Sequence, residues 1–345
     1  MKPVVATIAS FFAALLVTAQ PAAAADYLSR ADVRAFIDSM RNDHGLAVPE
    51  LERVLGAVSY QPTVARLLDP EPTSAPSPTR SYARYRSKFL TPALIAAGTQ
   101  FWERHADELQ RAEEEFGVPP EVILGILGVE TNYGRNTGSF RVVDALATAA
   151  FDGVRRQDFF RDELKELLLL ARDKGIDPLG IKGSYAGAVG LPQFMPSSYR
   201  KYAVDYDGDG VVDLRGSPAD AIGSVANYIN SFGWVSGEPA KAPVRLLPGS
   251  ETDLITGLKR VHDVAEVQIK GVVFSGSEPP TGPISIFELP TPGKPSKFFA
   301  GFTNFEVITR YNRSTFYASA VLELGQAIRK AVDLDSHSGV QITAR

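Results

Sequence analysis

The segment Pro119-Pro-Glu-Val-Ile-Leu-Gly-Ile-Leu-Gly-Val-Glu-Thr-Asn-Tyr-Gly134 carries the strongest structural signal in this 345-residue chain. Proline is tolerated in the first turn of a helix, so the Pro-Pro pair predicts a helix start. From Ile123, apolar residues recur at the i, i+3 and i+4 positions of one buried helix face, and the i+7 position is Glu130. We expect the helix to end at Gly134, which places Glu130 in the last turn, next to a loop.

Glu130 therefore occupies a position where the pattern requires an apolar side chain. Burying a carboxylate is costly unless it is protonated or paired, and apolar surroundings raise its pKa. A glutamate with a raised pKa suits a general acid that works near neutral pH. From spacing alone, however, the stronger interpretation is an internal ion pair with Arg135, Arg155 or Arg156.

The N-terminus has the features of a secretory signal. Lys2 precedes an apolar run from Val4 to Val17, and four alanines, 22–25, provide small residues for cleavage. We expect residues 1–25 to be a signal peptide, too short to remain as a transmembrane anchor. The chain contains no cysteine, which excludes disulfides, cysteine nucleophiles and a lipid-modified cysteine. The sequence thus predicts a soluble periplasmic protein without a transmembrane or lipid anchor.

Composition excludes further classes of function. The formal net charge is −4, and no long block of lysine and arginine occurs, so nucleic acid is not an expected partner. The four histidines show no His-Glu-x-x-His spacing, so a zinc peptidase is not supported. Ser198-Tyr-Arg-Lys201 fits one element of penicillin-recognising enzymes, but its partner motifs are missing.

Around the central helix the chain divides into segments of different character. We expect a mainly α fold (α+β) in which a helical core carries a small β-rich insertion. Helices are predicted over 91–116, 157–174, from Pro196, over 218–232 and over 314–332, and strands at 267–270, 272–274, 284–287 and 298–302. The predicted units are an N-terminal helical region with a linker (26–80), a catalytic core (81–236), the β-rich insertion (237–303), a return to the core (304–334) and a disordered tail (335–345).

An acidic loop, Asp205-Tyr-Asp-Gly-Asp-Gly210, matches the start of a calcium-binding loop. Carboxylates stand at positions 1, 3 and 5, and glycine allows the sharp turn at position 6. The ligands would be Asp205, Asp207, Asp209, the Val211 carbonyl and, through water, Asp213. Position 12 is Gly216 instead of the usual glutamate. We expect a structural calcium ion, with no task in acid–base chemistry.

Three motifs, in order along the chain, are similar to those of the lytic murein transglycosylase B family. They are Glu130-Thr-Asn-Tyr-Gly, Lys182-Gly-Ser-Tyr-Ala-Gly-Ala-Val-Gly-Leu-Pro-Gln-Phe-Met-Pro-Ser-Ser-Tyr, and Thr309-Arg-Tyr-Asn-Arg-Ser. The resemblance runs from about Tyr82 to Ala331 and is much weaker over 237–297.

The resemblance implies a goose-lysozyme-like helical core with one catalytic glutamate, here Glu130, and no catalytic cofactor. Such enzymes cut the β-1,4 bond between N-acetylmuramic acid and N-acetylglucosamine in peptidoglycan glycan strands. Their glutamate protonates the leaving oxygen and then deprotonates the muramyl C6 hydroxyl, which closes a 1,6-anhydro ring. Two alternatives stay open: a muramidase that uses water, and an inactive peptidoglycan-binding protein. The sequence names no protein partner.

The resemblance also assigns residues to the site. The cleft wall would contain Ser184, Gln193, Tyr228, Tyr311, Asn312 and Tyr317, with Tyr85, Arg155 and Arg156 as further substrate contacts. It adds Asp220 to the calcium ligands, although Ser217-Pro-Ala-Asp220 also fits a helix capping box. Tyr317 could equally be a core residue, and Asn312 could cap the last helix.

Overall fold

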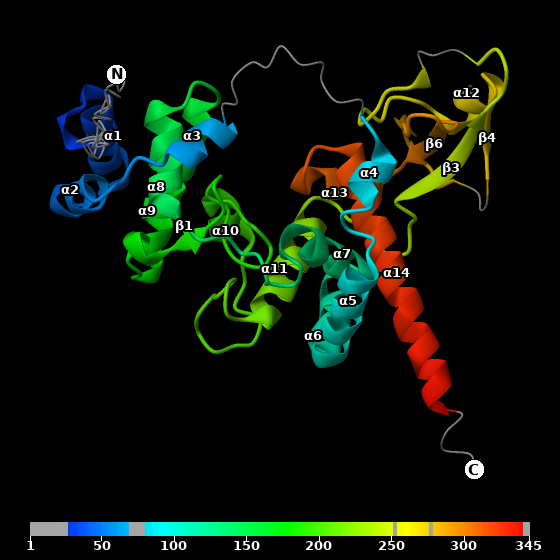
Figure 1. Ribbon diagram of the computed structural model, residues 1–345, viewed down its shortest axis with the longest axis horizontal. Helices are drawn as coiled ribbons and strands as arrows, with labels where there is room; N and C mark the ends of the chain where they lie inside the picture. The colour runs from blue at the N-terminus through cyan, green and yellow to red at the C-terminus, as the bar shows by residue number, and fades with distance from the viewer. Residues whose placement is uncertain (1–26, 69–79, 251–253, 276–278, 341–345) are drawn as a thin grey trace, which may run out of the picture.

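The computed structural model describes residues 27–68, 80–250, 254–275 and 279–340, so the expected signal peptide and most of the linker lie outside the described residues. Figure 1 shows an elongated molecule with the first helices at one end and a small sheet at the other. Most of the described residues are helical, which confirms the mainly α class. Within the described chain, no helix combines the length and apolar character needed to cross a membrane.

The N-terminal region packs against one end of the core. It comprises a 3-10 turn Tyr27–Ser29 and helices α1 Ala31–His44, α2 Val48–Gly56 and α3 Pro62–Leu68. Its apolar residues share a buried cluster with α8 Val142–Ala147, the π-helical turn Thr148–Asp152 and α9 Gln157–Lys174.

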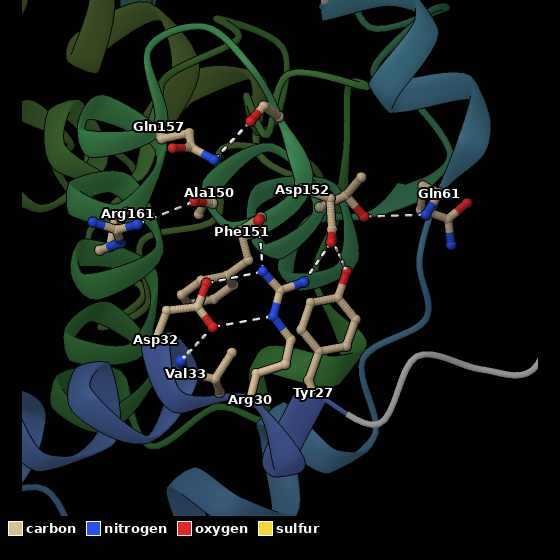
Figure 2. Close-up of polar contacts among 12 residues, drawn as sticks. Tyr27, Arg30, Asp32, Val33, Gln61, Ala150, Phe151, Asp152, Gln157 and Arg161 are labelled. Carbon is tan, nitrogen blue, oxygen red and sulfur yellow. Dashed lines mark hydrogen bonds and ion pairs between the residues drawn. The ribbon is translucent and has the colours of Figure 1, made fainter.

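One arginine ties this region to the π-helical turn, as Figure 2 shows. The guanidinium of Arg30 donates to the Phe151 carbonyl at 2.7 Å and to the carboxylates of Asp32 and Asp152. Tyr27 donates its hydroxyl to the same Asp152 at 2.5 Å. The N-terminal helices are therefore attached by polar contacts as well as by apolar packing.

The middle of the chain forms a helical core. Its remaining elements are α4 Tyr82–Arg86, α5 Pro92–Arg104, α6 Ala106–Phe116, α7 Pro120–Thr131, the strand pair β1 Phe140–Arg141 and β2 Lys182–Gly183, a 3-10 turn Pro178–Gly180, α10 Pro196–Tyr202 and α11 Pro218–Ser231. The single helix predicted over 91–116 is wrong, because His105 leaves helical geometry (φ −127°, ψ 33°) and separates α5 from α6.

Helix α7 is the centre of this core and packs most extensively against the last helix, α14 Thr315–Val340. Glycines allow the two backbones to touch. A Cβ added at Gly125 would lie 2.3 Å from the Val321 carbonyl oxygen, and one at Gly325 would lie 2.1 Å from that of Glu121. Helix α14 also continues to Val340, so the tail expected to be disordered from 335 is helical as far as 340.

The β-rich insertion is a four-stranded antiparallel sheet in the order β4-β3-β6-β5. Its strands are β3 Lys241–Leu246, β4 Val272–Phe274, β5 Ser285–Leu289 and β6 Lys297–Gly301, followed by helix α13 Thr303–Tyr311. The strand predicted at 267–270 is wrong, because these residues lie in and just after α12 Val264–Ile269. Asp263 caps this helix by accepting from the Ala265 amide. The Phe287 ring stacks on Phe305 of α13, which joins the sheet to the core.

Candidate active site

Glu130 lies in the last turn of α7, one residue before the helix ends. The helix ends at Thr131, earlier than the predicted Gly134, because Asn132 and Tyr133 both adopt positive φ (52° and 56°). The Thr131 hydroxyl donates to the Leu191 carbonyl at 2.8 Å. This bond fixes the end of α7 against the glycine-rich loop that follows β2.

The hydrogen-bonding partner of Glu130 is a tyrosine of the last helix. Tyr317, only 2% exposed, donates its hydroxyl to Glu130 Oε1 at 2.6 Å. The interpretation of Glu130 as half of an ion pair with Arg135, Arg155 or Arg156 is therefore wrong. Burial and the Tyr317 hydroxyl account for the pKa of this carboxyl group.

Burial dominates the ionisation of Glu130. Removal from water raises its pKa to about 7, and the Tyr317 hydrogen bond, which favours the ionised form, opposes part of that rise. A group with this pKa is present in both protonation states near neutral pH. It can therefore deliver a proton and later accept one.

Aromatic side chains surround the carboxyl group. The Tyr311 ring lies nearly parallel to that of Tyr317, with centroids 6.4 Å apart, and Tyr228 meets Tyr311 edge to face at 4.9 Å. Tyr85 packs on Phe316 at 5.7 Å. Burial raises the pKa of Tyr85, Tyr311 and Tyr317, and the negative charge of Glu130 raises each further.

Two of these phenols are held by backbone carbonyls. Tyr228 donates its hydroxyl to the Arg310 carbonyl at 2.9 Å, and Tyr311 donates to the Pro192 carbonyl. Phe194 packs against both rings, with centroids 5.4 and 5.9 Å away. The sequence does not predict Phe194 as part of this cluster, because one apolar ring within a motif does not reveal which side chains it contacts.

The polar residues expected in the cleft wall lie in the glycine-rich loop after β2 and in the turn after α13. Ser184 accepts the Ala188 amide at 3.0 Å on its hydroxyl oxygen. Gln193 has φ 51° and donates its amide to the Gly190 carbonyl at 2.9 Å. Asn312 is exposed and follows α13, but it does not cap α14. That position belongs to Ser314, whose hydroxyl accepts the Tyr317 amide at 3.3 Å.

Arg155 and Arg156 lie just before α9, away from the aromatic cluster in sequence. The guanidinium of Arg156 is 4.0 Å from the centre of the Phe159 ring. This contact directs the Arg156 side chain along α9. A substrate contact for Arg155 or Arg156 stays a prediction.

The acidic loop brings three carboxylates together. Ligand atoms of Asp205, Asp207 and Asp209 lie within 4.8 Å of one another, and all three residues are exposed. Asp205 also accepts the amides of Gly208 and Gly210, both at 2.8 Å, which closes the loop around its carboxylate. Converging oxygen ligands of this charge fit a calcium ion.

Asp220 supports the acidic loop through hydrogen bonds to the loop backbone. It is fully buried, and its carboxylate accepts the amides of Tyr206 and Asp213, both at 2.7 Å. The Ser217 hydroxyl accepts the Asp220 amide at 3.2 Å, so the serine half of the capping box forms. The carboxylate, however, binds loop amides instead of the N-cap amide. At position 12, a Cβ on Gly216 would lie 2.4 Å from the Asp213 carboxylate, so Asp213 occupies that space.

Comparison with known proteins identifies the family. Residues 29–326 match the family model described as the transglycosylase SLT domain. The chain belongs to this family. It is 42% identical over 314 residues to membrane-bound lytic murein transglycosylase B of Escherichia coli K12, an alignment that covers 89% of this chain and 85% of that protein.

Several solved structures share the fold. Slt35 of E. coli, solved with bulgecin A and with calcium, has a TM-score of 0.81 at 41% identity, covering 89% of this chain and 95% of that one. SltB1 of Pseudomonas aeruginosa has a TM-score of 0.83 at 42% identity, covering 89% and 100%. SltB3 of P. aeruginosa, solved with NAG-NAM-pentapeptide, has a TM-score of 0.74 at 31% identity, covering 86% and 79%. This SLT-domain chain is a peptidoglycan lytic transglycosylase of the lytic murein transglycosylase B family, as the motifs predicted.

Proposed function

We propose that Glu130 acts alone as acid and then base when this transglycosylase cleaves the β-1,4 bond between N-acetylmuramic acid and N-acetylglucosamine. The observation that carries the proposal is a carboxyl group with a pKa of about 7, half-buried at a helix end and held by one phenol. Protonated Glu130 donates to the leaving oxygen as the glycosidic bond breaks. The resulting carboxylate accepts the proton of the muramyl C6 hydroxyl, whose oxygen bonds to C1 and closes the 1,6-anhydro ring.

The positions of the other buried acids support a single-carboxylate mechanism. Most glycosidases use two carboxylates that flank the bond. In the described residues, the other buried acids are bound elsewhere: Asp144 by Arg141, Glu163 by Ser197, and Asp220 by the calcium loop. A nucleophile within the substrate removes the need for a second acid.

The aromatic cluster and its neighbouring turns are proposed to hold the glycan. Tyrosine faces pack on pyranose rings, while hydroxyls and amides bind sugar hydroxyls and acetamido groups. The proposed contacts are Ser184, Gln193, Tyr228, Tyr311, Asn312 and Tyr317, with Tyr85, Arg155 and Arg156 further out.

A calcium ion in the acidic loop is proposed to be structural. Asp205, Asp207 and Asp209 would ligate it, together with the Val211 carbonyl and Asp213, and Asp220 would hold the loop or ligate in addition. The calcium complex of Slt35 supports this assignment. The ion would supply positive charge that offsets the three converging carboxylates.

The proposed place of action is the periplasm, with the mature protein soluble after loss of residues 1–25. Peptidoglycan lies there, and the N-terminal pattern fits export. Subcellular fractionation tests this proposal, because recovery in the membrane fraction after a high-salt wash would contradict it.

Mass spectrometry of digested sacculi tests the chemistry. We expect anhydromuropeptides, which are one water lighter than reducing-end products, from the native chain and at least 1,000-fold less product from a Glu130→Gln variant. Reducing-end products would assign a muramidase, and no product would assign a glycan-binding protein. Full activity of the variant would refute the role of Glu130.

A further inference from the structure

Leu191, in the glycine-rich loop after β2, is hydrogen-bonded through both of its backbone groups to distant parts of the chain. Its carbonyl accepts the Thr131 hydroxyl at 2.8 Å, and its amide donates to the Leu214 carbonyl at 2.7 Å. Thr131 directly follows Glu130 in α7. Leu214 directly follows Asp213, a proposed ligand of the calcium ion in the acidic loop. One residue thus links the end of α7 to the acidic loop.

The Thr131 side chain holds the last turn of α7. Thr131 is only 1% exposed, and besides donating to Leu191 its hydroxyl oxygen accepts the Gly134 amide at 3.0 Å. These bonds lie where the backbone leaves helical geometry, since Asn132 and Tyr133 both have positive φ. A buried hydroxyl and its partners are costly to leave unpaired, so the two bonds fix this helix end.

The loop segment that holds Leu191 is itself anchored. Gly190 has φ 76°, and a Cβ there would lie 2.3 Å from the Leu214 carbonyl oxygen, so the two backbones touch. Leu214 is fully buried, and the Pro192 carbonyl accepts the Tyr311 hydroxyl. A displacement of the backbone at Leu214 therefore moves Leu191 with it.

We infer that Thr131 is a positioning residue for Glu130, and that Leu191 makes this position depend on the acidic loop, where bound calcium orders the end of α7. This inference rests on the proposed function, both for the role of Glu130 and for the calcium ion. A reacting group must be held closely in its productive geometry, and a misplacement of 1 Å costs about a hundredfold in rate. The residue next to Glu130 is well placed to prevent such a displacement.

Thr131→Val tests the positioning role, because it removes the hydroxyl and keeps the branched shape. We expect kcat on soluble glycan fragments to fall about ten- to hundredfold with little change in KM. A loosened helix end admits water to Glu130, so its pKa falls below about 7 and the alkaline limb of kcat/KM moves to lower pH. Thr131→Ser keeps the hydroxyl and should retain the native alkaline limb.

Thr148→Val is the matched control. Thr148 is also fully buried, and its hydroxyl oxygen accepts the Gln61 amide at 3.0 Å in the π-helical turn. This variant should lose stability but keep the native kcat and the native alkaline limb. An unshifted limb in Thr131→Val, a shifted limb in Thr131→Ser or the same shift in the control would each refute the positioning role.

Hydrogen exchange followed by NMR tests the link to the acidic loop without turnover. The probe is calcium alone, added to the metal-free native chain. We expect calcium to slow exchange of the Leu191 and Asn132 amides about fivefold, at the lower end of typical couplings between sites. The Asn132 amide donates to the Gly128 carbonyl, a bond that all the variants keep. In Thr131→Val the calcium effect should remain at Leu191 and disappear at Asn132, whereas Thr131→Ser and Thr148→Val should show it at both amides.

Two results would refute the link: slower exchange in the acidic loop with no change at Asn132, or an effect at Asn132 that persists in Thr131→Val. Unchanged exchange throughout the acidic loop itself would show that the loop does not bind calcium, and would equally overturn the dependence on this ion. Because exchange needs no product, a failure of the transglycosylase mechanism is detected separately, by mass spectrometry of digested sacculi.

Discussion

In the proposed mechanism, Glu130 is protonated when the glycosidic bond breaks and ionised when the anhydro ring closes. Its surroundings meet both requirements, because apolar burial favours the protonated form and the Tyr317 hydroxyl favours the carboxylate. Tyr317 is therefore a positioning residue that also adjusts the pKa of Glu130. Both effects are measurable at the level of single side chains.

Replacing Tyr317 by phenylalanine should shift the pH dependence of activity. The pKa of Glu130 rises above about 7 when the hydrogen bond to its ionised form is lost, so the alkaline limb of kcat/KM moves to higher pH. The shift is expected to be on the order of one pH unit, with a lower kcat because ionised Glu130 loses its support. Tyr199→Phe, which removes a part-buried phenol bond to the Val212 carbonyl, is the control. An alkaline limb that stays in place would contradict the role given to Tyr317.

Replacing Glu130 by glutamine should stabilise the protein above neutral pH. The folded-state pKa of about 7 exceeds the ordinary 4.5, so the native chain loses stability as pH rises between these values. The full loss is on the order of 3 kcal/mol, and glutamine avoids it because it does not ionise. Denaturant unfolding at pH 4 and pH 8 checks this, with equal stabilities at pH 4 and a more stable variant at pH 8. Glu103→Gln, an exposed control, should show no such pH dependence.

Sequence patterns located Glu130 but not its partner. The apolar stripe of α7 marks a position where a carboxylate is out of place, so the residue could be found from the 16 residues Pro119–Gly134. Tyr317 is 187 residues away, and no local pattern says which side chain of a distant helix faces a given position. The arginine interpretation failed for the same reason, because it considered only charged residues near in sequence.

At the level of elements, the contact between α7 and α14 sets the distance from Glu130 to Tyr317. The Gly125→Ala and Gly325→Ala variants each place a methyl group against a backbone carbonyl that cannot move independently of its helix. We expect a loss of about 1–3 kcal/mol in stability for each, together with reduced kcat, since the helices must separate. Thermal unfolding and sacculus digestion measure the two effects. Gly180→Ala, where a Cβ has open space, is the control, and comparable losses there would refute the packing argument.

The acidic loop should respond to calcium as one unit. Calcium is expected to raise the melting temperature of the native chain, with a gain near 2.7 kcal/mol when its concentration is 100 times Kd. Asp205→Asn removes one of three converging carboxylates and should lose most of this gain, whereas Asp43→Asn, an exposed aspartate of α1, should retain it. Differential scanning calorimetry of each variant, with EDTA and with added calcium, measures these melting temperatures. An unchanged melting temperature would mean that the loop has no structural metal.

Helix starts were easier to predict than helix interruptions and strands. Proline near the start marked α7, α10 and α11, because its fixed φ fits a first turn. The break at His105 has no such marker, since neither glycine nor proline occurs there. The segment 267–270 has β-branched residues, but the Asp263 cap and a Lys270–Glu266 ion pair favour helix. Strand β3 was missed because its pairing with β4 and β6 is non-local.

For the whole molecule, Arg30 should control how firmly the N-terminal helices are attached. Arg30→Ala removes the guanidinium from Asp152 and frees the Phe151 carbonyl, so local opening becomes easier. We expect faster hydrogen exchange in α1 and α2, with α7 and α14 unchanged. Arg34→Ala, on the exposed side of α1, is the control. Equal exchange in the two variants would show that apolar packing alone holds this region.

The glycine contact between α7 and α14 also has a consequence for biosynthesis. A chain is made and exported from its N-terminus, and helices distant in sequence dock only after the later one has emerged. Glu130 is synthesised early, whereas its hydrogen-bonding partner, Tyr317, lies within the last 30 residues of the sequence. A nascent or truncated chain would therefore have the acid without its partner, and the apolar surface of α7 would be uncovered. In the proposed mechanism, Glu130 therefore lacks the hydroxyl that favours its carboxylate until α14 has packed against α7.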